Sequence, residues 1–445
     1  MIESELISYP VGGGEIQRAQ LVRFDAWSEL DFFAPEYDRA AFDKIYALYS
    51  TFTVVKYPWV FGQMVMFHVP DDMDLPFSPQ TKYGELADRQ IIAAAVLEGG
   101  VKLVGGKPVF FTKAAKALWN ELEKRDYVRI VCGKLPHTKI LPIGGTFGFL
   151  SECERTARLK ANCSFFTMDC FDRASVYDKL GNPIGMRVKN GVVASPPQFG
   201  REALTVRGGK VSVEIPQLRQ LAVVIGGKTY RHGENAEFFE RPACRKTPRG
   251  GGVDLVVIGQ SVEAVHPGGG TPVPTSGFVL RTEDASVKAG AAVSYRGMED
   301  VEFALQVGNS IVVNGKTTDR LISPFYNIRN PWKTVYPPSL YPLDFTGARA
   351  PRTALGADKD GRPMLLWAEG AGKFGHVSGA EGCGASLSEL GEMCERVGMY
   401  NAVNLDGGGS SQILLNNVRS LKISDRDDKT FAEKERAIPL GLIIR

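Results

Sequence analysis

The chain has 445 residues, of which 44% are hydrophobic and 23% are charged, and 53 basic against 50 acidic side chains give a net charge of +3. This composition is typical of a soluble globular protein and excludes a fibrous or largely disordered chain. The length allows one large domain or two to three ordinary ones. A nearly balanced charge indicates no extended nucleic-acid footprint, so we expect no nucleic-acid partner.

The N-terminus carries no recognisable targeting signal. Residues 1–20 contain neither the basic segment nor the apolar segment of a secretory signal peptide. The longest apolar stretch, residues 91–97, is too short to span a membrane. Seven cysteines without a C-x-x-C pair favour reduced thiols. We therefore expect a cytoplasmic or otherwise non-exported protein with no membrane span.

Residues 30–142 are predicted to form a separate, mixed helical module or an insertion. Segments 37–50, 85–97 and 112–125 have the composition of helices, and the last has an apolar face at helical spacing. A short strand is expected over residues 127–132.

The remainder of the chain is predicted to be rich in β-hairpins. Turn-forming pairs at 190–191, 208–209, 226–227, 314–315 and 360–361 each separate two runs suited to strands. One helix is expected over 150–159 and a stronger one over 386–397, where Ser386 and Glu389 form a capping box. We therefore predict an α+β fold: mixed, largely antiparallel, curved β-sheets with flanking helices, plus the more helical N-terminal module.

Residues 404–411, NLDGGGSS, combine three glycines with a carboxylate, an amide and two hydroxyls. Glycine-rich backbone can turn its N–H groups inward to bind an anion. A carboxylate beside such a nest suits cleavage of a sugar or phosphate ester. A tight turn, in which Asp406 and the serines only satisfy backbone groups, explains the same residues equally well.

This segment resembles the signature of the phosphodiester glycosidase family, N-x-D-G-G-G-S-S after a helix. Further matches follow in the family's order: ANCSFF at 161–166, NPIGMRVKNGV at 182–192, PTSGFVL at 274–280, RTALGADKDGRPMLLWAEG at 352–370, GASLSELGEMCERVGM at 384–399, and Glu435-Arg436. The resemblance implies a phosphodiester glycosidase-like domain over residues 143–445. Residues 16–26 resemble the family's first strand, so residues 1–29 would supply the first strand of that domain.

The family resemblance implies a hydrolase that cleaves the C1–O–phosphate bond of a sugar-1-phosphodiester, with a glycan or sugar phosphate as substrate. Such chemistry needs a carboxylate near the anomeric carbon and positive charge at the phosphate. Asp406 is the first candidate for the catalytic carboxylate, and Glu369 is its candidate partner. The substrate-binding candidates would grip the phosphate, hold sugar hydroxyls or form the cradle: Arg352, Arg436, Asn162, Asn404, Gly407, Gly408, Gly409, Ser410 and Ser411.

Two departures from the family pattern leave the substrate open. Glu369-Gly370-Ala371 stands where D-G-R is usual, and Cys163 follows Asn162 where glycine is common. Two other functions stay open: a non-catalytic carbohydrate- or phosphate-binding module, and a structural, particle-associated protein that retains the fold. No cofactor follows from the sequence. The oxygen-rich loop could hold a divalent cation, but oxygen ligands are too common for any metal ligand to be assigned.

Overall fold

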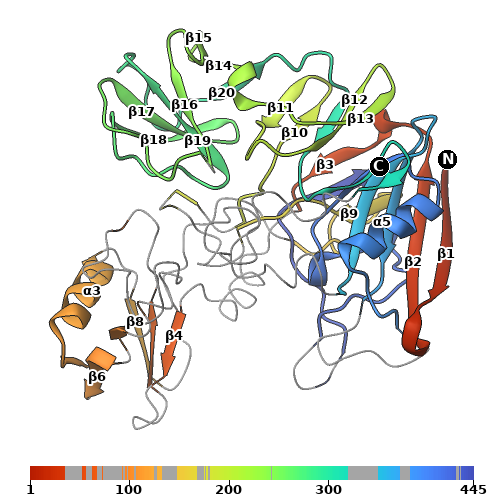
Figure 1. The fold of residues 1–445 in the computed structure, drawn as a ribbon, viewed down its shortest axis with the longest axis horizontal. Helices are drawn as coiled ribbons and strands as arrows, with labels where there is room; N and C mark the ends of the chain where they lie inside the picture. The colour runs from red at the N-terminus through yellow and green to blue at the C-terminus, as the bar shows by residue number, and fades with distance from the viewer. Residues whose placement is uncertain are drawn as a thin grey trace.

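A computed structural model describes residues 1–35, 148–167, 181–318, 349–370 and 381–445, apart from residues 242, 427–429 and 431 (Figure 1). It also describes residues 175, 177 and 178 and shorter stretches between residues 53 and 132.

An antiparallel seven-stranded sheet joins the two ends of the chain. Figure 1 shows its N-terminal strands, in red, beside strands of the blue C-terminal part. Successive side chains of a strand point to opposite faces, so each central strand contributes to two separate apolar cores. In spatial order the strands are β1 (Ile2–Pro10), β2 (Ile16–Phe24), β25 (Pro363–Ala368), β24 (Arg352–Ala357), β26 (Asn401–Asn404), β22 (Ser310–Val313) and β23 (Lys316–Thr317).

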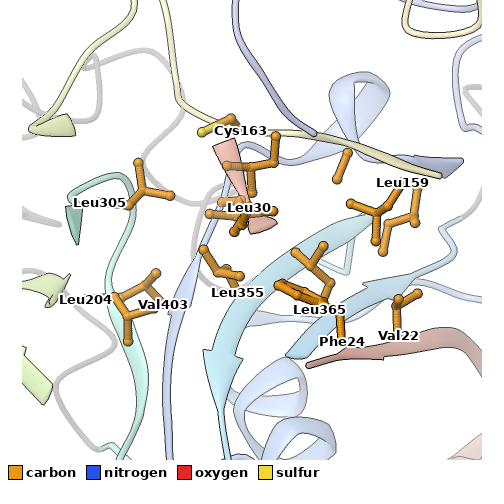
Figure 2. Packing of buried hydrophobic residues seen from close by; sticks show 14 of the residues in the cluster. Val22, Phe24, Leu30, Leu159, Cys163, Leu204, Leu305, Leu355, Leu365 and Val403 are labelled. Carbon is orange, nitrogen blue, oxygen red and sulfur yellow. The ribbon is translucent and has the colours of Figure 1, made fainter. Parts of the chain in front are cut away.

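One face of this sheet contacts two further antiparallel sheets. Figure 2 shows Leu355, Leu365 and Val403 of the first sheet in one cluster with Leu159 and Leu204. The four-stranded sheet has the order β27 (Ile413–Leu415), β9 (Leu159–Asn162), β28 (Gly441–Ile444) and β3 (Asp31–Phe33). The five-stranded sheet has the order β11 (Val192–Ser195), β10 (Arg187–Lys189), β21 (Phe303–Leu305), β12 (Ala203–Arg207) and β13 (Lys210–Glu214).

The opposite face of the seven-stranded sheet is covered by helix α5 (Leu387–Arg396). Its predicted capping box is confirmed: the Glu389 N–H donates to Ser386 Oγ at 3.2 Å and the Ser386 N–H donates to Glu389 Oε2 at 2.9 Å. Leu387, Leu390 and Met393 recur at helical spacing and are buried against the sheet. The predicted helix over 386–397 is therefore present.

A third core lies between the five-stranded sheet and two smaller ones. The three-stranded sheet has the order β15 (Lys228–Arg231), β14 (Ala222–Ile225) and β20 (Val293–Arg296), and the four-stranded sheet has the order β16 (Glu237–Phe239), β19 (Gly277–Thr282), β17 (Val253–Ile258) and β18 (Ser261–Pro267). All five predicted hairpins are confirmed, as β10–β11, β12–β13, β14–β15, β22–β23 and β24–β25. Asn190 and Gly191 illustrate why: their φ angles of 49° and 76° are those that such two-residue turns require.

The predicted α+β class with a helical module is wrong, because the described residues form 28 strands but only two α-helices with described ends. Even the described part of residues 30–142 is mostly strands. One sheet has the order β4 (Thr53–Lys56), β5 (Gln63–Phe67) and β8 (Val128–Cys132), and the other pairs β6 (Val101–Val104) with β7 (Lys107–Phe110). The strand expected over residues 127–132 is present as β8, and it pairs antiparallel with β5, which lies outside the segments of helical composition.

The individual helix predictions had mixed outcomes. The helix over 112–125 is confirmed as α3 (Lys113–Lys124), but residues 150–159 form turns that lead into β9. Segment 37–50 lies outside the described residues, and of segment 85–97 only Ala93, Val96 and Leu97 are described, as helical. The remaining helices are 3₁₀ turns: η1 (Gly12–Gly14), η2 (Trp27–Glu29), η4 (Leu218–Gln220) and η6 (Gly408–Ser410). Within the described ranges no helix has the length and apolar character needed to cross a bilayer.

Candidate active site

Asp406 directly follows β26 and is tied to the end of β9. Its N–H donates to the Cys163 carbonyl at 2.9 Å. Its own carbonyl accepts hydrogen bonds from Asn162 Nδ2 at 2.6 Å and Ser411 Oγ at 3.4 Å. Residues more than 240 positions apart are thereby joined, and the backbone of Asp406 is fixed so that its half-buried carboxylate has a defined position.

Asn162 braces this junction from inside the protein. Its side chain is fully buried, and its Oδ1 accepts hydrogen bonds from Thr353 Oγ1 at 2.9 Å and from the Gln412 N–H at 3.0 Å. Because Nδ2 is bonded to the Asp406 carbonyl, both ends of the amide are engaged by the protein. The structure thus places Asn162 at the site, in contact with the catalytic candidate's backbone.

The glycine-rich loop is a tight turn whose N–H groups are mostly engaged. The Gly407 N–H donates to Asp406 Oδ1 and the Gly408 N–H to the Pro351 carbonyl, both at 2.9 Å. Ser410 and Ser411 donate to the Gly407 and Gly408 carbonyls within the 3₁₀ turn η6. These four donors are therefore unavailable to a ligand, so the inward nest favoured by the composition does not form from them.

Two of the glycines are required by close approach or by conformation. Gly408 has φ +60°, a left-handed conformation that favours glycine. A Cβ on Gly409 would overlap the Asp425 carboxylate, so this carboxylate lies directly on the turn. The loop is thus held on both sides, by Pro351 and by Asp425.

The carboxylate of Asp406 experiences opposing effects. Burial raises its pKa to about 6, against lowering contributions from the Ser410 hydroxyl, Arg436, the Gly407 N–H and Arg352. Ser410 Oγ is buried and forms no hydrogen bond of standard geometry with the described residues. Its hydroxyl therefore lowers the pKa of Asp406 as a nearby dipole. Asp406 can therefore change its protonation state close to neutral pH.

The two candidate arginines flank Asp406 and are bonded to the protein. Arg352 is 3% exposed, and its Nε donates to the Ala385 carbonyl at 3.1 Å. Burial lowers the pKa of Arg352 to about 10, partly offset by Asp406. Arg436 forms a two-pronged ion pair with Asp425, with Nε at 3.0 Å from one oxygen and Nη2 at 3.2 Å from the other. Both cations thus lie within electrostatic reach of Asp406.

Glu369 is fully buried and engaged by three donors. Its Oε2 accepts from the Gly382 N–H at 2.7 Å and pairs with Arg18 Nη1 at 2.9 Å, while its Oε1 accepts from the Lys422 N–H at 2.9 Å. No contact recorded for the described residues joins its carboxylate to Asp406. The structure therefore brings Asn162, Arg352, Arg436 and the glycine-rich loop to Asp406 but engages Glu369 elsewhere.

Asn404 is fully buried at the end of β26, beside Gly308. Neither atom of its side-chain amide has a hydrogen-bond partner in the described part of the chain. Buried polar groups are normally hydrogen-bonded, so this amide is an exception among the described residues. Across the described ranges no three His, Cys, Asp or Glu side chains gather as a metal site. A bound divalent cation therefore stays a prediction.

The comparisons with known proteins bear on the C-terminal part of the chain. Residues 245–445 match the phosphodiester glycosidase family. The predicted family resemblance is thereby confirmed over this segment. A stretch of 81 residues is 35% identical to mouse N-acetylglucosamine-1-phosphodiester alpha-N-acetylglucosaminidase, covering 18% of this chain and only 14% of the mouse protein.

Three solved structures align over the whole chain at low similarity. A hypothetical protein from Synechocystis has 14% identity, a TM-score of 0.40 and 62% of its chain covered. The second is the catalytic domain of zebrafish N-acetylglucosamine-1-phosphodiester alpha-N-acetylglucosaminidase, auto-inhibited by its pro-peptide. It has 10% identity and a TM-score of 0.40, and 83% of its chain is covered. A protein from Burkholderia pseudomallei has 15% identity and a TM-score of 0.42, and 97% of its chain is covered. These scores are too low to support an argument, so the family assignment depends on the sequence matches.

The phosphodiester glycosidase segment contains Arg352, Glu369, Asp406 and Arg436, whereas Asn162 lies before it. Sequence reasoning missed Thr353, which directly follows Arg352 in the R-T-A motif and bonds Asn162. It also passed over Arg187, which approaches the site from β10. The available signal was a charged residue inside an otherwise uncharged stretch, GMRV at 185–188.

Proposed function

We propose that this chain hydrolyses the C1–O–phosphate bond of a sugar-1-phosphodiester, with Asp406 as the catalytic carboxylate. The observation that carries the proposal is the half-buried Asp406 carboxylate, which lies on the glycine-rich turn inside the segment that matches the family and has a pKa raised to about 6. A carboxylate titrating near neutral pH is suited to proton transfer under ordinary conditions. N-acetylglucosamine is the sugar to test first, because it appears in the name of the mouse relative.

The reaction passes through a transition state in which positive charge develops on the sugar ring. A nearby carboxylate can stabilise this charge directly, or it can activate a water molecule that attacks the anomeric carbon. Ionised Asp406 would do one of these, while Arg352 and Arg436 would stabilise its ionised form and offset the negative charge of the phosphate. The unsatisfied Asn404 amide would hydrogen-bond a sugar hydroxyl.

Glu369, the candidate second carboxylate, would act by positioning. Its contacts with Arg18, Gly382 and Lys422 would hold residues 381–384 and 420–425 together, and the latter segment carries Asp425 against Gly409. Asp406 would then be the only one of the two carboxylates to meet substrate.

The test is release of free N-acetylglucosamine from its 1-phosphomethyl ester by the wild-type chain and by Asp406→Asn. The matched control is Asp360→Asn, the same substitution at an exposed hairpin residue. We expect release with wild type and the control but not with Asp406→Asn. Release that persists undiminished in Asp406→Asn would contradict the assignment.

A non-catalytic binding module is the second candidate, because Glu369 and four loop N–H groups are already engaged by the protein. Saturable binding of the ester without sugar release, over a range of pH, would favour the module over the hydrolase.

A further inference from the structure

Arg187 is a cation near Cys163 for which the described part of the chain provides no hydrogen-bond or ion-pair partner. It begins β10 and is half-buried. Its Nε is completely shielded from solvent and has no hydrogen-bond partner, and no ion pair joins the guanidinium to the described residues. A shielded donor without an acceptor is unfavourable, and native structures retain few of them.

The other arginines near Asp406 differ in this respect. Arg436 is held by both oxygens of Asp425, and Arg352 donates to the Ala385 carbonyl. Some of the N–H donors of Arg436 and Arg352 are therefore already bonded to the protein before a ligand binds. No such contact of Arg187 is found among the described residues, and a planar guanidinium can bind two oxygens of one phosphate at once.

Cys163 connects Arg187 to Asp406. Its carbonyl accepts the Asp406 N–H at 2.9 Å, and its thiol lies within electrostatic reach of both charges. Burial raises the pKa of this thiol to about 12, so it stays neutral and does not balance the charge of Arg187. Arg187 and Asp406 are therefore both near Cys163, whose thiol carries no charge.

We propose that Arg187 binds the anionic phosphate group of the substrate while Asp406 acts at the sugar. The inference rests on the proposed function for the identity of the ligand. A guanidinium that meets phosphate gains the acceptors that the protein does not supply. Arg187 would therefore determine that the site prefers glycosides with a phosphate leaving group over neutral ones.

The experiment measures binding and turnover in wild type, Arg187→Met, Arg187→Gln and Arg187→Lys. The control is Arg231→Met, at an exposed position on β15. Calorimetry measures the affinity for N-acetylglucosamine 1-phosphate and for inorganic phosphate. Kinetics compare the 1-phosphomethyl ester with 4-nitrophenyl N-acetylglucosaminide, which has the same sugar but no phosphate.

We expect Arg187→Met and Arg187→Gln to weaken phosphate binding and raise KM for the phosphodiester about tenfold to hundredfold, the effect of losing charge-assisted hydrogen bonds. Parameters for the neutral glycoside should not change, and Arg187→Lys should recover part of the phosphate affinity. The melting temperature should not fall, because the lost guanidinium has no hydrogen-bond or ion-pair partner among the residues that the structure describes. A purely structural role predicts a lower melting temperature and equal effects on both glycosides.

The inference is overturned if wild type binds neither phosphate probe at millimolar concentration, or if the Met and Gln variants bind them as wild type does. Phosphate binding that depends on Arg187, without any sugar release, would support this inference while rejecting the hydrolase. Sugar release with an unchanged KM in Arg187→Met would support the hydrolase and reject the role of Arg187.

Discussion

Asp406 is the residue at which burial and charge compete most directly. Its carboxylate accepts the Gly407 N–H and is influenced by two arginines, yet burial still raises its pKa to about 6. Replacing it with asparagine is nearly isosteric and preserves an acceptor for Gly407. We expect Asp406→Asn to fold and to lose about 10²–10⁴-fold in kcat/KM, the usual contribution of a positioned acid or base. Steady-state kinetics on the 1-phosphomethyl ester measure this loss.

The same substitution has a predictable effect on stability. The folded pKa of about 6 lies above the ordinary value of 3.8, so the folded state binds the proton more tightly than the unfolded state. The contribution of protonated Asp406 to the free energy of unfolding is fully present below pH 4 and is lost as the pH rises through 6. One pKa unit corresponds to about 1.4 kcal/mol, so ionised Asp406 costs at most about 3 kcal/mol at pH 7.

Asp406→Asn should therefore raise the melting temperature at pH 7 and leave it nearly unchanged at pH 4. Thermal melts of wild type and variant at both pH values check this. A variant less stable than wild type at pH 7 would show that Asp406 chiefly holds the loop together, as the tight-turn interpretation requires.

Neutralising Glu369 should lower the stability of the protein, in contrast to neutralising Asp406. Its two oxygens accept separate backbone N–H groups and one also pairs with Arg18, so glutamine would place an NH₂ group against a donor. We expect Glu369→Gln to lose about 1–3 kcal/mol of stability. Chemical denaturation measures the loss, with Glu392→Gln on the exposed side of α5 as control. Lost turnover at unchanged stability would instead support a catalytic role for Glu369.

Among the elements, α5 shows how tertiary contacts reverse a local preference. Alanine normally stabilises a helix relative to glycine by about 1 kcal/mol. A Cβ on Gly391, however, would lie 2.6 Å from Thr317 Cγ2 and 3.0 Å from the Ile311 carbonyl. We expect Gly391→Ala to lower the melting temperature, because the helix must move away from β22 and β23. Ser388→Ala, at an exposed position of the same helix, should not lower it.

The element predictions succeeded where a few neighbouring residues decide the structure. The five hairpins depend on turn pairs, and α5 depends on its capping box and apolar spacing. The helix expected over 150–159 failed, since this segment is organised by distant partners: Ser151 is bonded to Glu435, and the Leu150 carbonyl accepts from Lys160.

At the scale of the whole molecule, the segment between β3 and residue 148 leaves and re-enters the core near one place. Phe33 pairs with Gly441, and Gly148 forms a bridge with Ile438, three residues earlier. Along an extended chain this separation is about 10 Å. We therefore expect that a short linker can replace the intervening segment without disturbing β28.

We expect a chain in which a flexible Gly-Ser linker replaces residues 37–146 to fold cooperatively, with its β-rich circular dichroism retained. The reason is that the described residues of that segment contribute to none of the three apolar cores described above. Circular dichroism and thermal melting check this. Aggregation, or loss of the cooperative transition, would show that the segment is part of the core.

The sequence by itself determined the hairpins, the capped helix and the glycine-rich turn after Asp406, because each depends on residues within a few positions of one another. Only the tertiary structure decided the strands in the described part of residues 30–142 and the partners of each site residue. Glu369 pairs with Arg18, Asp406 is braced by Asn162, and Arg187 approaches Cys163 from a different sheet. Such contacts join segments distant in the chain, and burial sets their strength, so only the folded chain defines them.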